Sequence, residues 1–234
     1  MTSPKSNSIP KNCVIALDGP AGSGKSTTAR MLAARLKYNY LDTGAMYRAL
    51  TVLALRRRVL PSDGVVLKKL ADEMQIRFET QKEVNRVFVD GEDMTERIRM
   101  PEITRHVSEV SAHRGVREAM VGKQQELGKE GNIVAEGRDT TTVVFPDAHL
   151  KVYLDASLEC RAQRRLLDMV KLGIETSLEE QEADLRRRDT FDSGRQHSPL
   201  RRAEDAYLID TTHMTIDEQV DKIISLLKTA AKGK

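Results

Sequence analysis

Residues 19–26 read Gly-Pro-Ala-Gly-Ser-Gly-Lys-Ser and follow an apolar run at residues 13–17, with Asp18 between the two. They match the pattern G-x-x-x-x-G-K-[ST] of a phosphate-binding loop (P-loop), in the position between a strand and a helix that this loop requires. The successive backbone N–H groups of such a loop, together with the positive N-terminal end of the following helix, bind an anion. The pattern therefore predicts a strand–loop–helix unit that binds phosphate groups.

The residue types around this loop indicate their roles. Gly22 and Gly24 let the backbone approach a phosphate where a Cβ would clash. Lys25 supplies a charge for the outer phosphates, and Ser26 can hold Mg²⁺. Asp18 is a second candidate for the metal, through a water bound to it; the alternative is a strand-end residue that bonds the loop backbone.

Composition narrows the class of protein. The chain has 234 residues, of which 39% are hydrophobic and 31% charged, and its net charge is +3. These values are typical of one enzyme-sized domain, with or without insertions, and argue against a disordered chain. The charge is too small to indicate nucleic acid as a partner.

Neither a membrane segment nor a secretion signal is evident in the sequence. No apolar stretch approaches the ~18 residues of a membrane span, so no membrane partner is expected. Residues 1–12 lack the apolar segment of a signal peptide and are predicted to form a flexible tail. Cys13 and Cys160 are interpreted as small hydrophobic residues in a reducing cytoplasm, which is the expected location.

Strand and helix patterns alternate along most of the chain. Short apolar runs predict five strands, at residues 13–17, 39–42, 132–135, 150–154 and 206–209. Helical periodicity predicts helices directly after the P-loop and over residues 45–57, 102–127 and 216–227. Gly115 is predicted to split or bend the third of these helices. Capping boxes of Ser177 with Glu180 and Thr215 with Glu218 mark two further helix starts. The alternation is typical of an α/β fold with a parallel sheet and helices on both faces.

Residues 61–100 break this alternation. Ile76–Glu79 and Arg86–Val89 alternate apolar and polar residues, and Asp90-Gly91 is a hairpin turn signal. A small antiparallel element is therefore predicted as an insert in the α/β core. The core would consist of residues 13–60 and 101–234.

Two short motifs follow predicted strands, at residues 42–48 (Asp-Thr-Gly-Ala-Met-Tyr-Arg) and 136–139 (Glu-Gly-Arg-Asp). Ligands bind at the carboxyl edge of open α/β sheets, so both motifs could face the crevice at the P-loop. Arg138 suits bidentate capture of phosphate, and Asp139 suits a donor such as an exocyclic amine. The alternatives are a helix cap and solvated charge in the first motif, and a local surface ion pair in the second.

A third group consists of Arg188, Asp192 and Arg195. Spacings of four and three place these residues on one face of a helix. An ion pair on a solvated helix and a basic face for RNA are the alternatives, although no aromatic residues are interleaved as RNA binding would favour.

Taken in order, these motifs resemble the bacterial cytidylate (CMP) kinase family. The resemblance covers essentially all of the chain after residue 12. It implies a three-layer P-loop kinase fold with a five-stranded parallel sheet and helices on both faces. The insert at residues 61–100 would bind the nucleoside monophosphate, and residues 165–200 would form a lid. The implied reaction transfers the γ-phosphoryl group of ATP to CMP or dCMP with Mg²⁺ as cofactor.

The resemblance also implies roles for individual residues. ATP would be bound by the loop residues Gly19, Pro20, Ala21, Gly22, Ser23, Gly24, Lys25, Ser26 and Thr27. The acceptor nucleotide would be bound by Thr43, Arg48, Ser108, Arg117, Arg138, Asp139, Arg188, Asp192 and Arg195. The catalytic charges would be those of Lys25, Arg138, Arg188 and Arg195, and the metal would be held by Ser26 and Asp18. Within the acceptor site, Ser108, Arg117 and Asp139 would read cytosine.

One motif departs from the family's pattern. The family usually has Gly-Arg-Asp-Ile-Gly-Thr, whereas this chain has Thr140, Thr141 and Thr142 after Asp139. The added β-branched side chain near the acceptor site could shift the turn or change substrate affinity.

Catalysis is expected to need no general base, because an acceptor phosphate is largely ionised near neutral pH. Positioning and charge stabilisation would suffice. A site that hydrogen-bonds cytosine would favour CMP and dCMP over UMP. A monomer is expected. The alternatives are another small-acceptor kinase, such as UMP/CMP, adenylate or shikimate kinase, and a P-loop nucleotide switch or RNA-binding regulator.

Overall fold

The computed structural model describes residues 12–81 and 84–230, so the predicted N-terminal tail lies outside the described residues except for Asn12. A central sheet has the strand order β2-β6-β1-β7-β8, and every neighbouring pair is parallel. Its strands are β1 (Val14–Asp18), β2 (Asn39–Asp42), β6 (Ile133–Gly137), β7 (Leu150–Asp155) and β8 (Tyr207–Asp210). The predicted five-stranded parallel sheet is confirmed, and each strand begins and ends within two residues of its predicted range.

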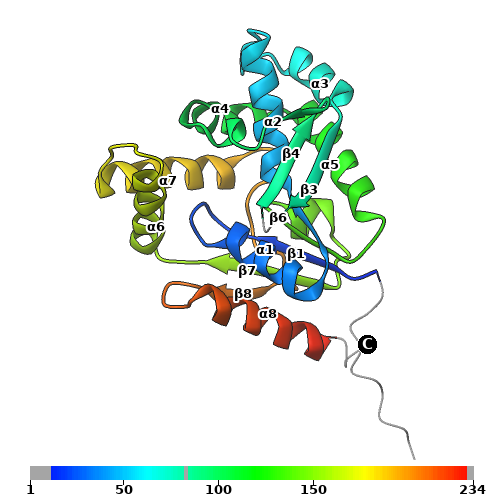
Figure 1. Ribbon diagram of the computed structural model, residues 1–234, viewed down its shortest axis with the longest axis vertical. Helices are drawn as coiled ribbons and strands as arrows, with labels where there is room; N and C mark the ends of the chain where they lie inside the picture. Colours follow the sequence, from blue (N-terminus) through cyan, green and yellow to red (C-terminus); the bar gives the residue numbers. More distant parts are fainter. Residues whose placement is uncertain (1–11, 82–83, 231–234) are drawn as a thin grey trace, which may run out of the picture.

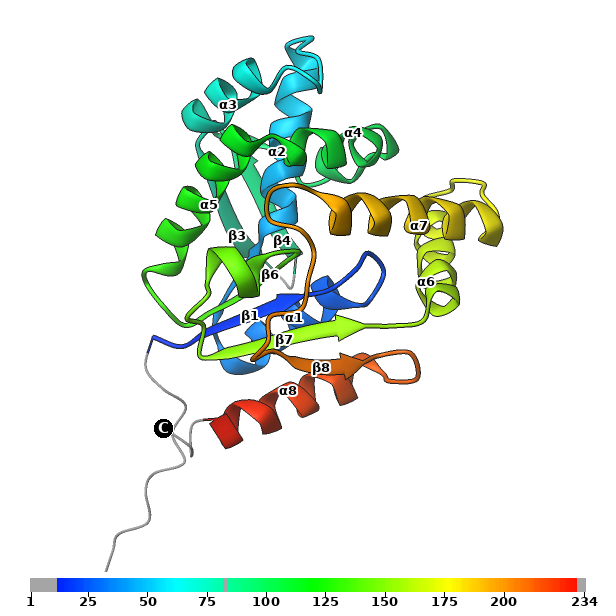
Figure 2. The same ribbon diagram turned by 180° about the vertical axis from the view of Figure 1, so that it is seen from behind.

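Helices cover both faces of this sheet (Figures 1 and 2). On one face, Ile15, Leu17 and Val134 pack against α1 (Lys25–Leu36) and α8 (Ile216–Ala230). On the other, Ile133 and Ala135 pack against α2 (Thr43–Arg56) and its neighbours. Successive residues of a strand point to opposite faces, which explains how one apolar run serves both layers.

The insert contains the predicted antiparallel element and one helix that the sequence did not predict. The sheet order is β3-β4-β5, with β3 at Ile76–Gln81, β4 at Val84–Val89 and β5 at Glu92–Asp93. The additional helix is α3 (Gly64–Glu73), which Asp63 caps by accepting a hydrogen bond from the N–H of Val66 (3.1 Å). A short 3₁₀ turn, Arg97–Arg99, leads out of the insert.

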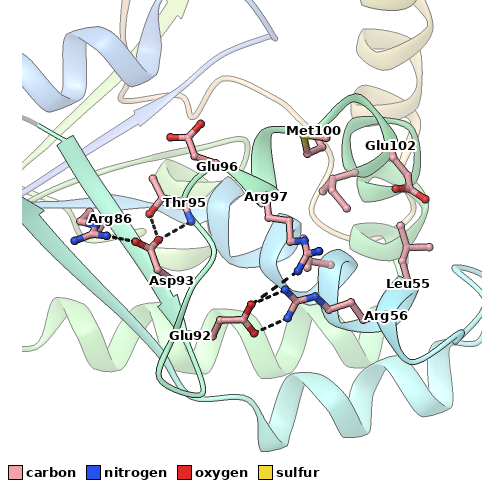
Figure 3. A pocket seen from close by; sticks show the side chains of 12 residues that line it. Leu55, Arg56, Arg86, Glu92, Asp93, Thr95, Glu96, Arg97, Met100 and Glu102 are labelled. Atoms are coloured by element: carbon pink, nitrogen blue, oxygen red, sulfur yellow. Dashed lines mark hydrogen bonds and ion pairs between the residues drawn. The ribbon is translucent and has the colours of Figure 1, made fainter. Parts of the chain in front are cut away.

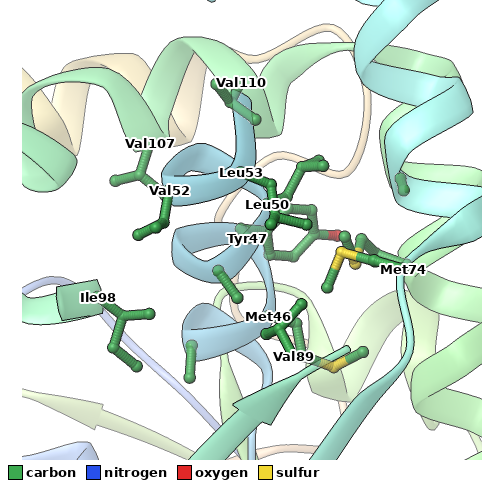
Figure 4. Packing of buried hydrophobic residues seen from close by; sticks show 14 of the residues in the cluster. Met46, Tyr47, Leu50, Val52, Leu53, Met74, Val89, Ile98, Val107 and Val110 are labelled. Atoms are coloured by element: carbon green, nitrogen blue, oxygen red, sulfur yellow. The ribbon is translucent and has the colours of Figure 1, made fainter. Parts of the chain in front are cut away.

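Helix α2 lies at the centre of an apolar cluster (Figure 4). Met46, Leu50 and Leu53 of this helix are buried there. Val89 of β4 and Val107 of α4 (Pro101–Ala112) belong to the same cluster. The cluster runs from the central sheet into the insert. The predicted boundaries at residues 61 and 100 therefore do not coincide with a break in packing.

The long helical stretch after the insert is divided into α4 (Pro101–Ala112) and α5 (Arg114–Gly128). The break is at His113, which is extended (ψ 126°) and lies with Nε2 2.8 Å from the carbonyl of Pro61. The predicted split of this stretch is confirmed, but it lies at His113, two residues before Gly115. A Cβ on Gly115 would lie 2.9 Å from Cδ of Lys68 on α3, so this glycine permits the close approach of two helices.

Helices α6 (Leu158–Lys171) and α7 (Leu178–Gly194) form a hairpin beside the sheet, drawn in yellow tones in Figure 1. Ala162 of α6 and Leu185 of α7 pack with Ala21 of the P-loop, so the hairpin rests on this loop. Both predicted capping boxes are confirmed, at Ser177–Glu180 and at Thr215–Glu218. Within the described ranges, no helix has the length and apolar character needed to cross a membrane.

Candidate active site

The P-loop joins β1 to α1 in a conformation that its glycines permit. Gly22 has a φ of +79°, a left-handed conformation that favours glycine. A Cβ on Gly19 would overlap the carbonyl oxygen of Leu154. Gly24 caps α1, and no side chain bonds to the first turn at this cap. The N–H groups of that turn therefore remain available to an anion.

Two arginines of α6 hold the loop from outside. Arg161 donates from Nη1 to the carbonyl of Ala21 (3.2 Å) and to Oδ2 of Asp189 on α7 (2.7 Å). Arg164 donates from Nη1 to the carbonyl of Gly22 (3.4 Å). The sequence reasoning gave neither arginine a role, because no local pattern places α6 against the loop.

Lys25 is buried and folded back on the loop. Its Nζ donates to the carbonyl of Pro20 (2.7 Å) and lies 3.5 Å from Oγ of Ser23. Burial, with a smaller contribution from the charge of Arg138, lowers the pKa of Lys25 to about 7. An incoming anion favours the charged form of the amine, so this side chain is suited to meet phosphate oxygens. Thr27, also predicted to bind ATP, is exposed on the first turn of α1.

Ser26 contacts a carboxylate to which the sequence reasoning assigned no role. Its Oγ donates to Oε1 of Glu136 (2.6 Å), and the hydroxyl of Tyr40 lies 3.2 Å from the same oxygen. Glu136 belongs to β6, and its carbonyl accepts from Oγ1 of the buried Thr43 (2.8 Å). Burial, followed by the charge of Glu136, raises the pKa of Asp42 to about 6. A hydroxyl and a carboxylate side by side form a donor set that suits Mg²⁺.

Asp18 is bonded to the loop after β6. Its Oδ1 accepts from the N–H (2.9 Å) of Thr140 and lies 2.6 Å from the Oγ1 of that residue. Its Oδ2 accepts from the N–H (2.7 Å) and the Oγ1 (2.6 Å) of Thr141. Burial raises the pKa of Asp18, and the threonine hydrogen bonds oppose this effect. A metal-bound water would have to displace one of these donors to reach the carboxylate.

Four arginines that were predicted to bind the acceptor nucleotide come together at the carboxyl edge of the sheet. Arg48 lies on α2, Arg138 follows β6, and Arg188 and Arg195 belong to α7 and its end. Arg188 is 8% exposed, and its buried Nε has no hydrogen-bond partner among the described residues. Burial and the charges of Arg48 and Arg138 lower the pKa of Arg188 to about 9. Arg165 of α6, which the sequence reasoning did not include, adds to this field by lowering the pKa of Arg48.

Asp192 is the main counter-charge within this group. Its Oδ2 accepts from Nε of Arg138 (3.0 Å), and its Oδ1 lies 3.9 Å from Nη1 of Arg195. Although burial favours the neutral carboxyl, three arginines, led by Arg138, hold the pKa of Asp192 below its usual value. Asp42, Glu136 and Asp139 add further negative charge around Arg48 and Arg195, yet Arg48 and Arg138 still lower the pKa of Arg188. An anionic ligand would relieve this repulsion between guanidinium groups.

The predicted base-reading residues lie beside this cluster. Arg117 and Asp139 are both buried and form an ion pair through Nη2 and Oδ2. Arg117 also lies over the ring of Tyr47, 5.2 Å from its centroid, and its Nε is buried without a partner among the described residues. Ser111 connects this pair to Ser108, because the Ser111 carbonyl accepts from Arg117 (3.0 Å) and its hydroxyl donates to the Ser108 carbonyl (3.0 Å).

A hollow of about 880 Å³ opens elsewhere, between α2, β4, β5 and α4 (Figure 3). Several of its charged side chains pair with one another, as in the bidentate contact of Arg56 with Glu92 (2.6 Å for both bonds) and the ion pair of Arg86 with Asp93. None of the predicted site residues lines this hollow. The hollow is therefore separate from the residues that were predicted to bind nucleotides.

A P-loop at the end of β1, next to clustered arginines at the carboxyl edge of a parallel sheet, defines a P-loop kinase. The family model of cytidylate kinase matches residues 15–229. The chain belongs to the cytidylate kinase family and is a phosphotransferase, as the resemblance of its motifs predicted.

Individual relatives support this assignment. The cytidylate kinase of Shouchella clausii is 47% identical over 214 residues, which are 92% of this chain and 95% of that protein. A bifunctional pantoate ligase/cytidylate kinase of a Synechococcus strain is 49% identical over 224 residues, which are 94% of this chain but 41% of that protein. Among solved structures, an uncharacterized protein from Eubacterium ventriosum has a TM-score of 0.52 at 12% identity, covering 93% of this chain and 99% of that one. The last likeness concerns the fold alone.

Proposed function

We propose that this protein transfers the γ-phosphoryl group of ATP to CMP or dCMP, giving ADP and CDP or dCDP. The observation that carries the proposal is the buried, under-neutralised arginine cluster beside the P-loop. Arg188 has a lowered pKa and an unpartnered Nε, which is the expected state of a guanidinium group whose partner is supplied by a bound nucleotide. Phosphate groups of two nucleotides bound side by side, at the P-loop and at the arginine cluster, would each contact cationic side chains.

The donor nucleotide would occupy the P-loop. The backbone N–H groups at the start of α1 and the ammonium of Lys25 would bind its phosphates. Mg²⁺ would be held by Ser26 together with Glu136, because these two side chains already share a hydrogen bond. We assign this carboxylate role to Glu136 instead of Asp18, whose oxygens are occupied by Thr140 and Thr141. The ion would neutralise charge on the phosphate oxygens.

The acceptor would be bound by side chains from three parts of the chain. Arg48, Arg138 and Arg195 would hold its phosphate, while Arg188 and Asp192 would contact the sugar hydroxyls. Because that phosphate is itself the nucleophile and is largely ionised, no side chain has to remove a proton. The arginines would position the two nucleotides and stabilise the charge of the transferring group.

Base selection would rest on the pair of Arg117 and Asp139. Cytosine offers an amine that a carboxylate accepts, together with N3 and O2 acceptors for a guanidinium or hydroxyl group. Uracil would present a carbonyl oxygen to the carboxylate instead. Since a site built around a hydrogen bond penalises a ligand that leaves it unmade, CMP and dCMP are favoured over UMP.

The α6–α7 hairpin, which includes most of the predicted lid at residues 165–200, would close over both nucleotides. It carries Arg188 and Asp192, and it rests on the P-loop through Ala162 and Leu185. Closure would bring the arginines onto the phosphates and exclude water that could otherwise hydrolyse ATP.

A coupled assay of ADP release with ATP and Mg²⁺ tests this function, using CMP, dCMP, UMP and AMP in turn as acceptor. We expect kcat/KM for CMP and dCMP to exceed that for UMP and AMP by at least about 100-fold. Equal values for UMP and CMP would contradict the base assignment. ADP release at the same rate without any acceptor would instead support a P-loop ATPase.

A matched pair of variants locates the selectivity. Asp139→Asn should lower the ratio of CMP to UMP activity, because the amide can donate to the uracil carbonyl. Asp93→Asn alters another carboxylate that is paired with an arginine, at the hollow remote from the P-loop. It should leave the ratio unchanged.

We further propose that the enzyme acts as a monomer in the cytoplasm. Neither Cys13 nor Cys160 is in a disulfide within the described residues, which fits a reducing compartment. Size-exclusion chromatography with light scattering checks the first point, and a dimer as the main species would contradict it.

A further inference from the structure

The contact between Asp18 and the two threonines joins the donor loop to the acceptor loop. Asp18 is the last residue of β1 and directly precedes the P-loop. Thr140 and Thr141 directly follow Asp139, and both belong to a π-helical turn, Thr140–Val144. The β1–β6 ladder ends at the pair of Asp18 with Gly137. The Asp18 carboxylate therefore continues the connection between the two strands beyond the point where backbone pairing stops.

The hydrogen bonds of this contact are buried and directional. Asp18, Thr140 and Thr141 are at most 1% exposed. Each carboxylate oxygen faces one backbone N–H and one hydroxyl, so the turn is held at two atoms and cannot rotate about a single bond.

The two hydroxyls are not equivalent. The Oγ1 of Thr140 lies near the carbonyl of Leu17 (2.9 Å) as well as near Oδ1 of Asp18, and its single proton can serve only one of them. The Oγ1 of Thr141 donates to Oδ2 of Asp18. Thr141 is therefore the side chain whose hydroxyl bears most directly on the carboxylate.

The charge of Asp18 reaches both halves of the site. It raises the pKa of Lys25 and the pKa of Arg138, which are the cationic groups on the donor side and the acceptor side respectively. Asp18 thus lies between the two groups that would hold the two phosphates. Both of its oxygens accept hydrogen bonds from Thr140 and Thr141.

We propose that Asp18 and Thr141 are positioning residues, which fix the loop carrying Arg138 and Asp139 in register with the P-loop. The proposal rests on the proposed function, because it concerns the alignment of a donor phosphate with an acceptor phosphate. In-line transfer requires the reacting atoms at near-contact distance, and a displacement of about 1 Å reduces the rate of such a step about 100-fold.

The test compares isosteric and conservative changes at residue 141. Thr141→Val removes the hydroxyl and keeps the backbone N–H that also bonds Oδ2. We expect kcat to fall about tenfold, with KM for ATP and for the acceptor within twofold of the wild type, because both nucleotides still bind but are misaligned. Thr141→Ser restores a hydroxyl donor and should return kcat to within twofold of the wild type.

Thr142 provides a matched control. Its Oγ1 is buried, but it has no hydrogen-bond partner among the described residues. Thr142→Val therefore makes the same chemical change one residue further along and should leave kcat within twofold. All variants are assayed below their measured Tm, with whichever monophosphate the wild type uses best. A failure of the cytosine assignment therefore leaves this test intact.

A double-mutant cycle with Asp18→Asn completes the experiment. If the carboxylate and the hydroxyl act through each other, Asp18→Asn/Thr141→Val is no slower than Asp18→Asn alone. Independent, multiplicative losses overturn the proposal. A Thr141→Val enzyme with wild-type kcat, or a Thr141→Ser enzyme as slow as Thr141→Val, overturns it without the cycle, should the Asp18 variant fail to fold.

Discussion

Arg138 and Asp192 are joined by a hydrogen bond of 3.0 Å from the guanidinium Nε to the carboxylate Oδ2. The first residue follows β6 in the core and the second lies on α7 of the hairpin, so this bond connects the two parts of the site. Asp192 is also the main anion among the clustered arginines. Removing the negative charge of Asp192 should therefore lower the stability of the fold, because this charge now reduces the repulsion between the arginines.

We predict that Asp192→Asn lowers the free energy of unfolding by about 2–3 kcal/mol. This is less than the loss expected for a fully buried pair, since the Arg138 side chain is 21% exposed. Inorganic phosphate should raise the Tm of the variant more than that of the wild type, because the anion replaces the missing charge. Urea unfolding and thermal scans measure both effects. Asp205→Asn removes a carboxylate that is itself exposed (67%), although its partner Lys151 is 10% exposed, and should change stability by less than about 1 kcal/mol. Equal phosphate shifts in wild type and Asp192→Asn would contradict this reasoning.

Arg188→Met should separate stability from activity. The buried guanidinium lacks a partner at Nε and is repelled by Arg48 and Arg138, so an apolar side chain should raise the free energy of unfolding by about 1 kcal/mol. At the same time kcat should fall about 100-fold, and the affinity for the acceptor should fall with it. Arg187→Met removes the neighbouring, exposed arginine and should alter neither quantity. Unchanged kcat in the Arg188→Met variant would identify Arg188 as a structural charge only.

The lowered pKa of Lys25 predicts a proton uptake on nucleotide binding. In the ligand-free protein this amine loses its proton near pH 7, whereas in the unfolded chain it keeps it to about pH 10.4. Donor phosphates restore the charge, so binding of ATP at pH 8 should take up close to one proton. Calorimetry in buffers of different ionisation enthalpy measures this number, and Lys25→Met should abolish it. No uptake by the wild type would contradict the assignment.

The same pKa fixes the sign of a stability effect. Between about pH 7 and pH 10 the unfolded chain binds more protons at Lys25 than the folded protein, so stability rises with pH in this window. From pH 7 to pH 9, the free energy of unfolding of the ligand-free wild type should rise by about 1–2 kcal/mol more than that of Lys25→Met. Urea unfolding of both proteins at both pH values checks this. If the free energy of unfolding of the wild type fell relative to that of Lys25→Met between pH 7 and pH 9, the prediction would be contradicted.

Gly137→Ala should disturb the contact between β6 and α2. A Cβ at this position would overlap Oγ1 of Thr43 and lie 3.0 Å from Cγ2 of Thr140. We expect a loss of about 1–3 kcal/mol in the free energy of unfolding. Thr43→Ala removes the first of these contacts, so the double variant should be more stable than the sum of the two single losses indicates. Gly122→Ala, where no atom lies within 4 Å of the added Cβ, serves as the control.

The central sheet could be predicted because buried parallel strands appear as short apolar runs, as at Val14–Asp18 and Ile133–Gly137. Helix α3 was missed because its first residues give no helical pattern: Val65 is 83% exposed, and the helix starts on Gly64. The break between α4 and α5 depends on a contact of His113 with the distant Pro61, which no local pattern records.

Among the proposed site residues, the loop and the arginines could be identified from motifs, because their spacing is local. Glu136 was not assigned a role, since its proximity to Ser26 arises from the order of the strands. The partners of Asp18 were missed for the same reason: Thr140 and Thr141 are 122 and 123 residues away in sequence. Strand order and register, rather than propensity, decide such contacts.

Arg161 bonds the P-loop through Ala21 and α7 through Asp189 with the same Nη1 atom. A swing of α7 away from the sheet would therefore break the Asp189 bond or pull on the guanidinium group that also bonds the P-loop. We expect a movement of α7 and a loosening of the P-loop to accompany each other for this reason.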